Sequence, residues 1–374
     1  MKKKIYLDYN ATSFCTVWDK HISEILKNPL NPSSNHFFGR YAKSILEKAR
    51  LQVAKLVNIN DFRLTNIVFT SSATEANNII MKNFYKENIL TLSTEHESII
   101  KHKVYCKNIK IINVDKNGVI NLDNLEMLLK KSDKSKKTLV TTMMANNETG
   151  VIQPIKEITK IAKKYNAFVH SDWVQSAGKI TTDFFDSQLD SISISAHKIG
   201  GLPGAGALIY RHPLSLTPQI IGGGQEKSIR SGTENVLHCY LFGLAAEKRL
   251  LNLDKYHSHT KKLQSYLEGK IKKVCKEIKI WSCDVERIPN TSSIMMPKVN
   301  STIQLIKFDM QNIAISSGSA CSSGSMGKES YVLKAMQCCR EESKCTIRVS
   351  TDINTTMDEI NSFIDTWKNI QKAK

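Results

Sequence analysis

Short apolar runs alternate with longer amphipathic stretches along much of the chain. In the first helical stretch the apolar side chains recur every three or four positions, at Ile45, Leu46, Ala49, Val53, Leu56 and Val57, with charged residues between them. Further helices are expected over 122–131 and over 154–165, which starts at a proline. Strands are predicted at 67–70, 89–92, 109–112, 139–142, 167–169 and 192–194. This alternation predicts an α/β fold with a mainly parallel sheet and helices on both of its faces.

The pattern changes beyond about residue 250. A helix is expected from 261–267, and short strand-like runs follow at 291–296 and 347–349. We interpret this part as a smaller α+β C-terminal domain that packs against the first. The predicted large domain spans 13–250, and the small domain spans 251–374 together with 1–12. A chain of 374 residues, 41% hydrophobic and 24% charged, has the size and composition for two such cores.

Polar residues follow the predicted strands at the ends where parallel sheets bind ligands. Each of these residues alone is more often structural than catalytic, but several ends presenting suitable groups point to one shared site. The segments concerned are Ser71 to Glu75, His96, Asn146 with Asn147, Asp172 with Gln175, and Ser195 with His197 and Lys198.

Lys198 follows a strand and precedes a Gly-rich segment that ends at Gly206. A desolvated lysine can lose its proton and attack a carbonyl, either of a substrate or of pyridoxal phosphate. A loop lysine pointing at water is the alternative, and Lys198 alone does not decide between them. The neighbouring strand ends supply the partners that the first interpretation needs.

Pyridoxal phosphate accounts for the whole set of polar strand ends. Its ring nitrogen must stay protonated, and the carboxylate of Asp172 enforces this. The helix that opens at Ser71 to Glu75 offers free N–H groups to a phosphate, although the same residues also fit a simple N-cap. His96 is expected to stack on the ring and move protons. The remaining predicted cofactor ligands are Thr74, Ser195 and His197 at the phosphate, Gln175 and Asn147 near the ring oxygen, and Ala73.

Two features of the C-terminal part carry further chemistry. Small and polar residues over 316–325 surround Cys321, which predicts an exposed, mobile loop on which a thiolate can react. A harmless linker cysteine is the alternative. Arg348 lies in a strand-like run, where an arginine usually holds an anion, and its guanidinium matches a substrate carboxylate.

Charge and cysteine content add expectations about setting and partners. The net charge of +18 suits nucleic acid or an acidic protein, but heavy use of lysine throughout the chain explains it equally well. The nine cysteines lack paired C-x-x-C spacing, which argues for reduced thiols, and Cys338, Cys339 and Cys345 fit no common metal motif. Asp8 interrupts the apolar run after the basic start, and no later stretch reaches the length of a membrane span, so a cytoplasmic protein is expected.

Taken in order, the motifs resemble those of the cysteine desulfurases, class V members of the fold-type I pyridoxal phosphate enzymes. Any one of them is weak evidence, but together they cover nearly the whole chain. They are Tyr6 to Thr12, Asn31 to Ser34 with His36 and Gly39, Phe69 to Asn78, Asn146 to Gly150, Ser195 to Lys198, Arg230 to Asn235, and Ser316 to Cys321. The loop around Cys321 is similar to that of the subgroup serving iron–sulfur assembly and tRNA thiolation.

The resemblance implies a homodimer that takes sulfur from L-cysteine. Lys198 would carry the cofactor, Arg348 and Asn147 would hold the substrate carboxylate, and Thr233 would reach the phosphate in the neighbouring subunit. Cys321 would receive the sulfur as a persulfide, releasing alanine. A sulfur-acceptor protein is the implied partner, with tRNA as an indirect one. No resident metal is implied, although Cys321 is left open as a transient iron–sulfur ligand.

Other functions remain open from the residues alone. The chain could be another class V enzyme, an aminotransferase or a selenocysteine lyase, in which Cys321 is idle. A basic RNA-binding or scaffold protein on an inactive enzyme fold ranks lower, because Lys198, Asp172 and His96 are all present. The sulfur acceptor and any accessory subunit stay undetermined.

Overall fold

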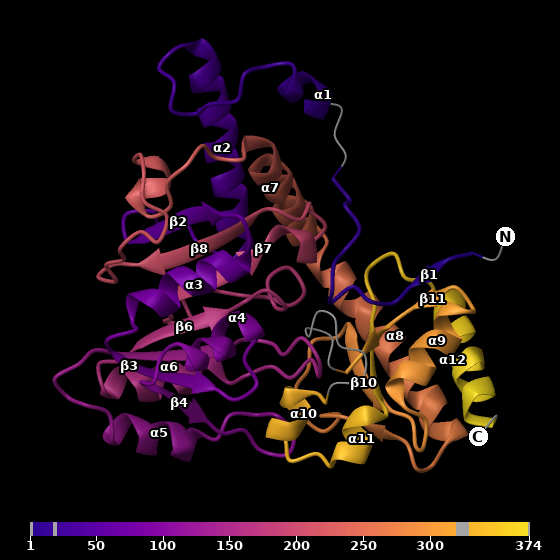
Figure 1. Ribbon diagram of the computed structural model, residues 1–374. Coiled ribbons are helices and arrows are strands. Elements are labelled where there is room, and N and C mark those ends of the chain that lie inside the picture. The colour runs from indigo at the N-terminus through magenta and orange to yellow at the C-terminus, as the bar shows by residue number, and fades with distance from the viewer. Residues whose placement is uncertain (1–2, 18–20, 319–328, 373–374) are drawn as a thin grey trace.

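The computed structural model describes residues 3–17, 21–318 and 329–372. Its larger sheet has seven strands in the order β2-β8-β7-β6-β5-β3-β4 (Figure 1). Their bounds are β2 (Thr65–Thr70), β3 (Asn88–Leu92), β4 (Ile109–Ile112), β5 (Thr138–Met143), β6 (Phe168–Asp172), β7 (Ser191–Ser195) and β8 (Gly206–Arg211). Neighbouring strands pair in parallel except that β8 runs antiparallel to both β2 and β7. The mainly parallel sheet predicted from the sequence is confirmed.

Helices cover both faces of this sheet. Successive side chains of a strand point to opposite faces, and those of β2 enter two separate cores: Ile67 and Phe69 join one cluster and Val68 joins the other. The first core also takes in buried residues of α2 (Phe37–Leu56), α5 (Leu122–Lys130), α6 (Ile155–Lys164) and α7 (Val236–Leu251). The second is closed by α3 (Ala73–Asn83) and α4 (Glu97–Ile100). The helices expected over 122–131 and 154–165 are therefore present within a residue of their predicted bounds.

A second, four-stranded sheet is formed mainly by the C-terminal part of the chain. Its order is β12-β13-β10-β9, with β9 (Lys279–Ile280), β10 (Thr291–Met295), β12 (Ser316–Ser317) and β13 (Thr346–Ser350). A core of its own joins it to α8 (Leu253–Val274), α9 (Ser301–Asp309) and α12 (Met357–Lys372). The remaining elements are α1 (His21–Leu26), α10 (Tyr331–Ala335), α11 (Arg340–Lys344) and three short 3₁₀ turns at Lys101–Val104, Ala196–Lys198 and Gln225–Ser228.

The N-terminal segment belongs spatially to this second part. Strand β1 (Ile5–Tyr6) pairs in parallel with β11 (Ile313–Ala314) (Figure 1). Asp8 forms a bridge to Ser350 of β13. Ile5 and Leu7 join the core of the smaller sheet. The grouping of residues 1–12 with 251–374, against 13–250, stays a prediction, and the strand pairing of β1 is the observation that favours it.

Three further findings concern the described residues only. None of their helices is both long enough and apolar enough to cross a bilayer. No cluster of three His, Cys, Asp or Glu side chains among them is arranged to hold a metal ion. The cysteines that the structure describes are free thiols.

Candidate active site

A cavity of about 300 Å³ opens at the carboxyl ends of the parallel strands. Segments that are far apart in sequence meet there: the turn at Asn10, the start of α3, the loops after β3 and β5, the ends of β6 and β7, and strand β13. Ten of the residues selected from the sequence line it, namely Ala73, Thr74, His96, Asn147, Asp172, Gln175, Ser195, His197, Lys198 and Arg348. The structure therefore brings these ten residues together on one cavity.

The start of α3 forms one wall of the cavity. Ser72 is its N-cap and accepts from the N–H of Glu75, whereas the first N–H groups of a helix have no acceptor within it. A glycine on the adjacent strand makes this approach possible, because a Cβ on Gly206 would lie 2.5 Å from the carbonyl carbon of Ser72. Burial and the nearby Lys198 lower the pKa of His197, which lines the same cavity, to about 4. The wall thus offers neutral and partly positive donors, which suit a phosphate.

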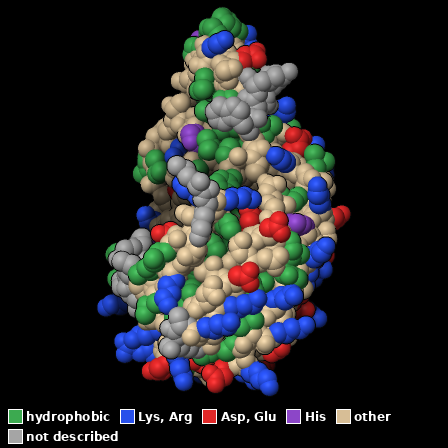
Figure 2. Space-filling view, turned by 90° about the vertical axis from the view of Figure 1, so that its right-hand side faces the viewer, with side chains coloured by type: hydrophobic (Ala, Val, Ile, Leu, Met, Phe, Trp, Pro, Cys, Tyr) green, Lys and Arg blue, Asp and Glu red, His purple; other side chains and the backbone are tan. Residues whose placement is uncertain are grey.

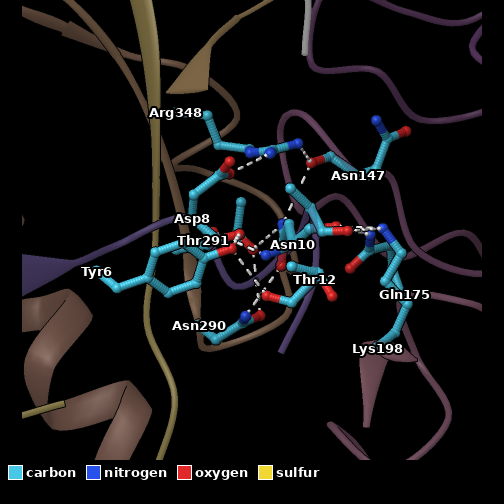
Figure 3. Close-up of polar contacts among 12 residues, drawn as sticks. Tyr6, Asp8, Asn10, Thr12, Asn147, Gln175, Lys198, Asn290, Thr291 and Arg348 are labelled. Carbon is cyan, nitrogen blue, oxygen red and sulfur yellow. Dashed lines mark hydrogen bonds and ion pairs between the residues drawn. The ribbon is translucent and has the colours of Figure 1, made fainter. Parts of the chain in front are cut away.

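Lys198 ends the turn that follows β7, and its side chain is tied to the N-terminal segment. Its Nζ donates to the backbone carbonyl oxygens of Asn10 at 2.6 Å and Ala11 at 2.7 Å (Figure 3). The backbone is held by the same segment, since the Ser13 hydroxyl donates to the Lys198 carbonyl. These contacts hold the amine at the rim of the cavity.

Asp172 is the last residue of β6, is 6% exposed, and has both carboxylate oxygens occupied. Asn77 Nδ2 donates to Oδ2 at 2.9 Å, and the N–H of Val174 donates to Oδ1 at 2.9 Å. The Asn77 amide is oriented by His170, whose Nε2 lies 3.0 Å from Asn77 Oδ1. Complete burial lowers the pKa of His170 to about 3, so this ring stays neutral at pH 7. Asn77 and His170 received no role in the sequence analysis; the position of His170 two residues before Asp172 on one strand face was the available signal.

His96 also lines the cavity, and it is the N-cap of α4. Its Nδ1 accepts the Ser98 N–H at 3.1 Å, which leaves the proton of the neutral ring on Nε2. Burial lowers the pKa of His96, and Lys198 acts in the same direction, while Asp172 opposes them. The neutral ring therefore has one defined tautomer.

Arg348 closes the cavity from the smaller sheet and is 1% exposed. Its Nη2 donates to Asp8 Oδ1 at 2.6 Å, and its Nη1 donates to the Asn147 carbonyl at 2.8 Å (Figure 3). Asn10 also reaches that carbonyl, with Nδ2 at 3.2 Å, and donates to Thr291 Oγ1 at 2.8 Å. The N-terminal segment thus joins both sheets at the cavity, which its motif in the sequence did not reveal.

Of the two remaining residues selected from the sequence, Thr233 and Cys321, only Thr233 is described by the structure, and it is exposed and does not line this cavity. Cys321 lies outside the described residues, but the chain on either side of it flanks the cavity. Before it, Ser316 pairs with Arg348 across β12 and β13; after it, the Ser330 hydroxyl donates to Glu148, whose pKa burial raises to about 7.

A lysine just after one strand, a carboxylate held at the end of the neighbouring strand, and a helix start on the same cavity are the arrangement of the fold-type I class of pyridoxal phosphate enzymes. The family model of the class V aminotransferases matches residues 5–363. The chain belongs to this family and, within it, to the cysteine desulfurases.

Individual relatives show the same membership over full length. The chain is 34% identical to "Cysteine desulfurase IscS" of Dictyoglomus turgidum, covering 99% of this chain and 95% of that protein. It is 36% identical to "Cysteine desulfurase IscS" of Ehrlichia chaffeensis, covering 95% and 88%. The crystal structure of a NifS-like protein from Rickettsia africae superposes with a TM-score of 0.91 at 45% identity, covering 99% of this chain and all of that one.

Proposed function

We propose that this protein is a cysteine desulfurase that moves the sulfur of L-cysteine to Cys321, leaving L-alanine and an enzyme persulfide. The carbon–sulfur bond of cysteine breaks, a sulfur–sulfur bond forms at Cys321, and a proton replaces sulfur on the carbon. The observation that carries the proposal is the single cavity that Lys198, Asp172, the start of α3 and Arg348 share. The names of the full-length relatives support it.

The residues of the cavity fit pyridoxal phosphate. Asp172 offers a buried carboxylate for a ring nitrogen, and Ala73, Thr74, Ser195 and His197 offer donors for a phosphate. When bound, the cofactor supplies an electron sink for the substrate carbons. Lys198 Nζ is the amine that would hold it covalently, and Gln175 and Asn147 lie on the same cavity for the ring oxygen.

The other side chains handle protons, substrate and sulfur. His96 would stack on the ring and transfer protons through Nε2, because its Nδ1 is already an acceptor for Ser98. Arg348 and Asn147 would bind the cysteine carboxylate, with the Arg348 guanidinium held in place by Asp8. Cys321 would receive the sulfur as a thiolate, the reactive form of a cysteine.

The finer proposals concern assembly and partners. We propose a homodimer in which Thr233 serves the cofactor phosphate of the neighbouring subunit, a cytoplasmic location suited to free thiols, and an acceptor protein that passes sulfur to iron–sulfur clusters or tRNA thiolation. Figure 2 shows many Lys and Arg side chains low on one face, which suits an acidic acceptor or tRNA. Binding to either should weaken steeply between low and physiological salt.

The test is an absorption spectrum of the purified protein with and without L-cysteine, read together with alanine and sulfide release. A yellow protein that, with a thiol reductant present to reduce the persulfide, forms equal amounts of alanine and sulfide without any keto acid supports the proposal. Cys321→Ser should keep the spectral response to cysteine yet release no sulfide. Full sulfide release by that variant, or activity only with a keto acid, would contradict the sulfur-transfer step.

A further inference from the structure

A second lysine, Lys179, lies directly behind the cavity. It is 1% exposed, although lysines are almost never buried to this degree without a specific partner. It does not line the cavity, and none of the roles proposed above involves it. Its position in the segment between β6 and β7 puts it four residues after Gln175.

Lys179 fixes the orientation of the Gln175 amide. Its Nζ donates to Gln175 Oε1 at 2.5 Å. An ammonium has donors only, and a neutral amine placed as here gives its N–H groups to Gln175 Oε1 and Asn10 Oδ1, so the amide oxygen faces Lys179 and the amide nitrogen faces the other way. Gln175 Nε2 accordingly donates to the Asn10 carbonyl at 3.0 Å, on the cavity side where Lys198 binds the same oxygen.

The same amine also steadies the Asn10 turn. Lys179 Nζ donates to Asn10 Oδ1 at 2.8 Å, and Asn290 Nδ2 donates to that oxygen at 3.0 Å. The carbonyl of Asn10 is the acceptor for both Gln175 Nε2 and Lys198 Nζ. The buried amine of Lys179 therefore fixes the positions of Asn10 and Gln175, which both surround the reactive Lys198.

Lys179 can donate both hydrogen bonds even though nearby positive charges favour its neutral form. Burial lowers its pKa well below the usual value, and Lys198, Arg249 and Arg348 act in the same direction, while Asp352 opposes them. A neutral amine still has two N–H donors, which is the number that Gln175 and Asn10 require. Its two contacts hold in either protonation state.

We propose that Lys179 is a positioning residue, which turns the Gln175 amide nitrogen toward the cofactor and holds the Asn10 carbonyl against Lys198. The inference rests on the proposed function, because it assumes that pyridoxal phosphate occupies the cavity. Without Lys179, the Gln175 amide is free to present its oxygen to the ring oxygen, where two acceptors repel each other.

The experiment uses the cofactor-loaded full chain and Lys179→Met, which keeps an unbranched side chain one atom shorter than lysine and removes its donors. The dissociation constant for pyridoxal phosphate should rise about tenfold, the scale of one lost hydrogen bond. The absorption maximum of the bound cofactor, and the pH at which its spectrum changes, should both shift. The control is Lys160→Met, an exposed residue of α6, which should match the wild type in all three measurements.

Two variants of Gln175 distinguish a positioning role of Lys179 from a general loss of structure. In Gln175→Met, adding Lys179→Met should shift the spectrum less than it does in the wild type, because the amide that it orients is gone and only the contact with Asn10 remains to be lost. If Lys179→Met fails to fold, Gln175→Glu decides: it keeps an acceptor toward Lys179 and loses the donor toward the cavity, so its spectrum should shift. An unchanged Gln175→Glu spectrum, or equal Lys179→Met shifts with and without Gln175, would overturn the inference. A wild-type protein that binds no pyridoxal phosphate would instead refute the proposed function.

Discussion

Arg348 is the residue at which structure and catalysis are hardest to separate. Its guanidinium holds Asp8 and the Asn147 carbonyl while lining the cavity. If it also binds the cysteine carboxylate, Arg348→Ala should weaken cysteine binding by roughly 1.5–3 kcal/mol, the range for a hydrogen bond to a charged group. The measurement is KM for L-cysteine together with a spectral titration of the bound cofactor.

A matched variant distinguishes the two roles of this arginine. Asp8→Asn removes the ion pair and leaves the guanidinium in place, so it should alter KM much less than Arg348→Ala. Equal KM values for Arg348→Ala and the wild type would exclude Arg348 as the carboxylate ligand. An equal effect of both variants would make its role structural.

The sequence could predict which residues lie at the cavity when their position just after a strand was enough to place them there. Lys198 and Asp172 follow strands, and the end of a parallel strand is itself the site. The residues that orient them were not predictable, because a hydrogen bond such as that from Asn77 to Asp172 spans 95 positions and depends on the packing of α3 against β6. Thr233 and Cys321 remain predictions, the first because it is exposed and does not line the cavity of its own chain and the second because it lies outside the described residues.

At the scale of elements, the site depends on the close contact between the start of α3 and strand β8, where there is no room for a side chain at Gly206. Gly206→Ala should push the start of α3 outward, because the added Cβ would lie 2.7 Å from the Ala73 nitrogen. Overpacking of this kind costs roughly 1–3 kcal/mol. We expect a lower free energy of unfolding in urea and weaker binding of pyridoxal phosphate.

Gly269 provides the control, since it lies in α8 with no neighbour within 4 Å of the added carbon. Gly269→Ala should therefore raise the free energy of unfolding by about 0.5–1 kcal/mol through better helix propensity. If Gly206→Ala behaved like Gly269→Ala, the close approach of α3 would not constrain the site.

His170 on strand β6 makes the free energy of unfolding depend on pH. Its pKa is about 3 in the folded protein and about 6.5 in an unfolded chain, so the unfolded state alone takes up a proton between these values. The resulting stability is complete above pH 6.5 and is lost as the pH falls toward 3, by roughly 1.4 kcal/mol per pH unit.

His170→Gln should keep a donor for Asn77 and reduce this slope, as urea unfolding at pH 7, 6 and 5 would show. His257→Gln, an exposed change on α8, should leave the slope unchanged. A His170→Gln protein that loses stability with acid as steeply as the wild type would assign the slope to other groups.

Helices and parallel strands were predictable because their hydrophobic period is local. Strand β8 was missed: it follows a Gly-rich segment and starts at Gly206, so the sequence suggested a loop ending there. What makes it a strand is not local, since it fills the gap between β2 and β7 with antiparallel pairs to both. Its Ala207 and Leu208 are fully buried only because helices cover both faces.

At the scale of the molecule, the exposed position of Thr233 leads to a test of the proposed dimer. Thr233→Asp should repel the cofactor phosphate, and Lys198→Ala should prevent covalent attachment, so each homodimer should be inactive. If Thr233 acts across the interface, a mixed dimer has one site with both changes and one with neither. Activity should then return to about half of the wild-type level per mixed dimer on the site-counting argument.

The mixed dimer must be isolated, for example with two different affinity tags, before its sulfide release is measured. If Thr233 acts within its own subunit, every site keeps one defect. A purified mixed dimer without activity would therefore contradict the shared site, whereas separate homodimers mixed without exchange provide the inactive reference.

The contacts of the N-terminal segment can form only late in translation, because its partners lie near the C-terminal end of the chain. Asp8 and its partner Arg348 are 340 positions apart, and the Asn10 N–H is bound by the equally distant Ser350. At roughly 5–20 residues per second, the ribosome makes these partners about 17–70 s after the segment itself. The strands from Thr65 to Arg211 have all been synthesised well before that moment. A nascent chain can thus assemble its large sheet early. The backbone carbonyl groups of Asn10 and Ala11, which accept hydrogen bonds from the Lys198 amine, reach their final positions only when translation is nearly finished.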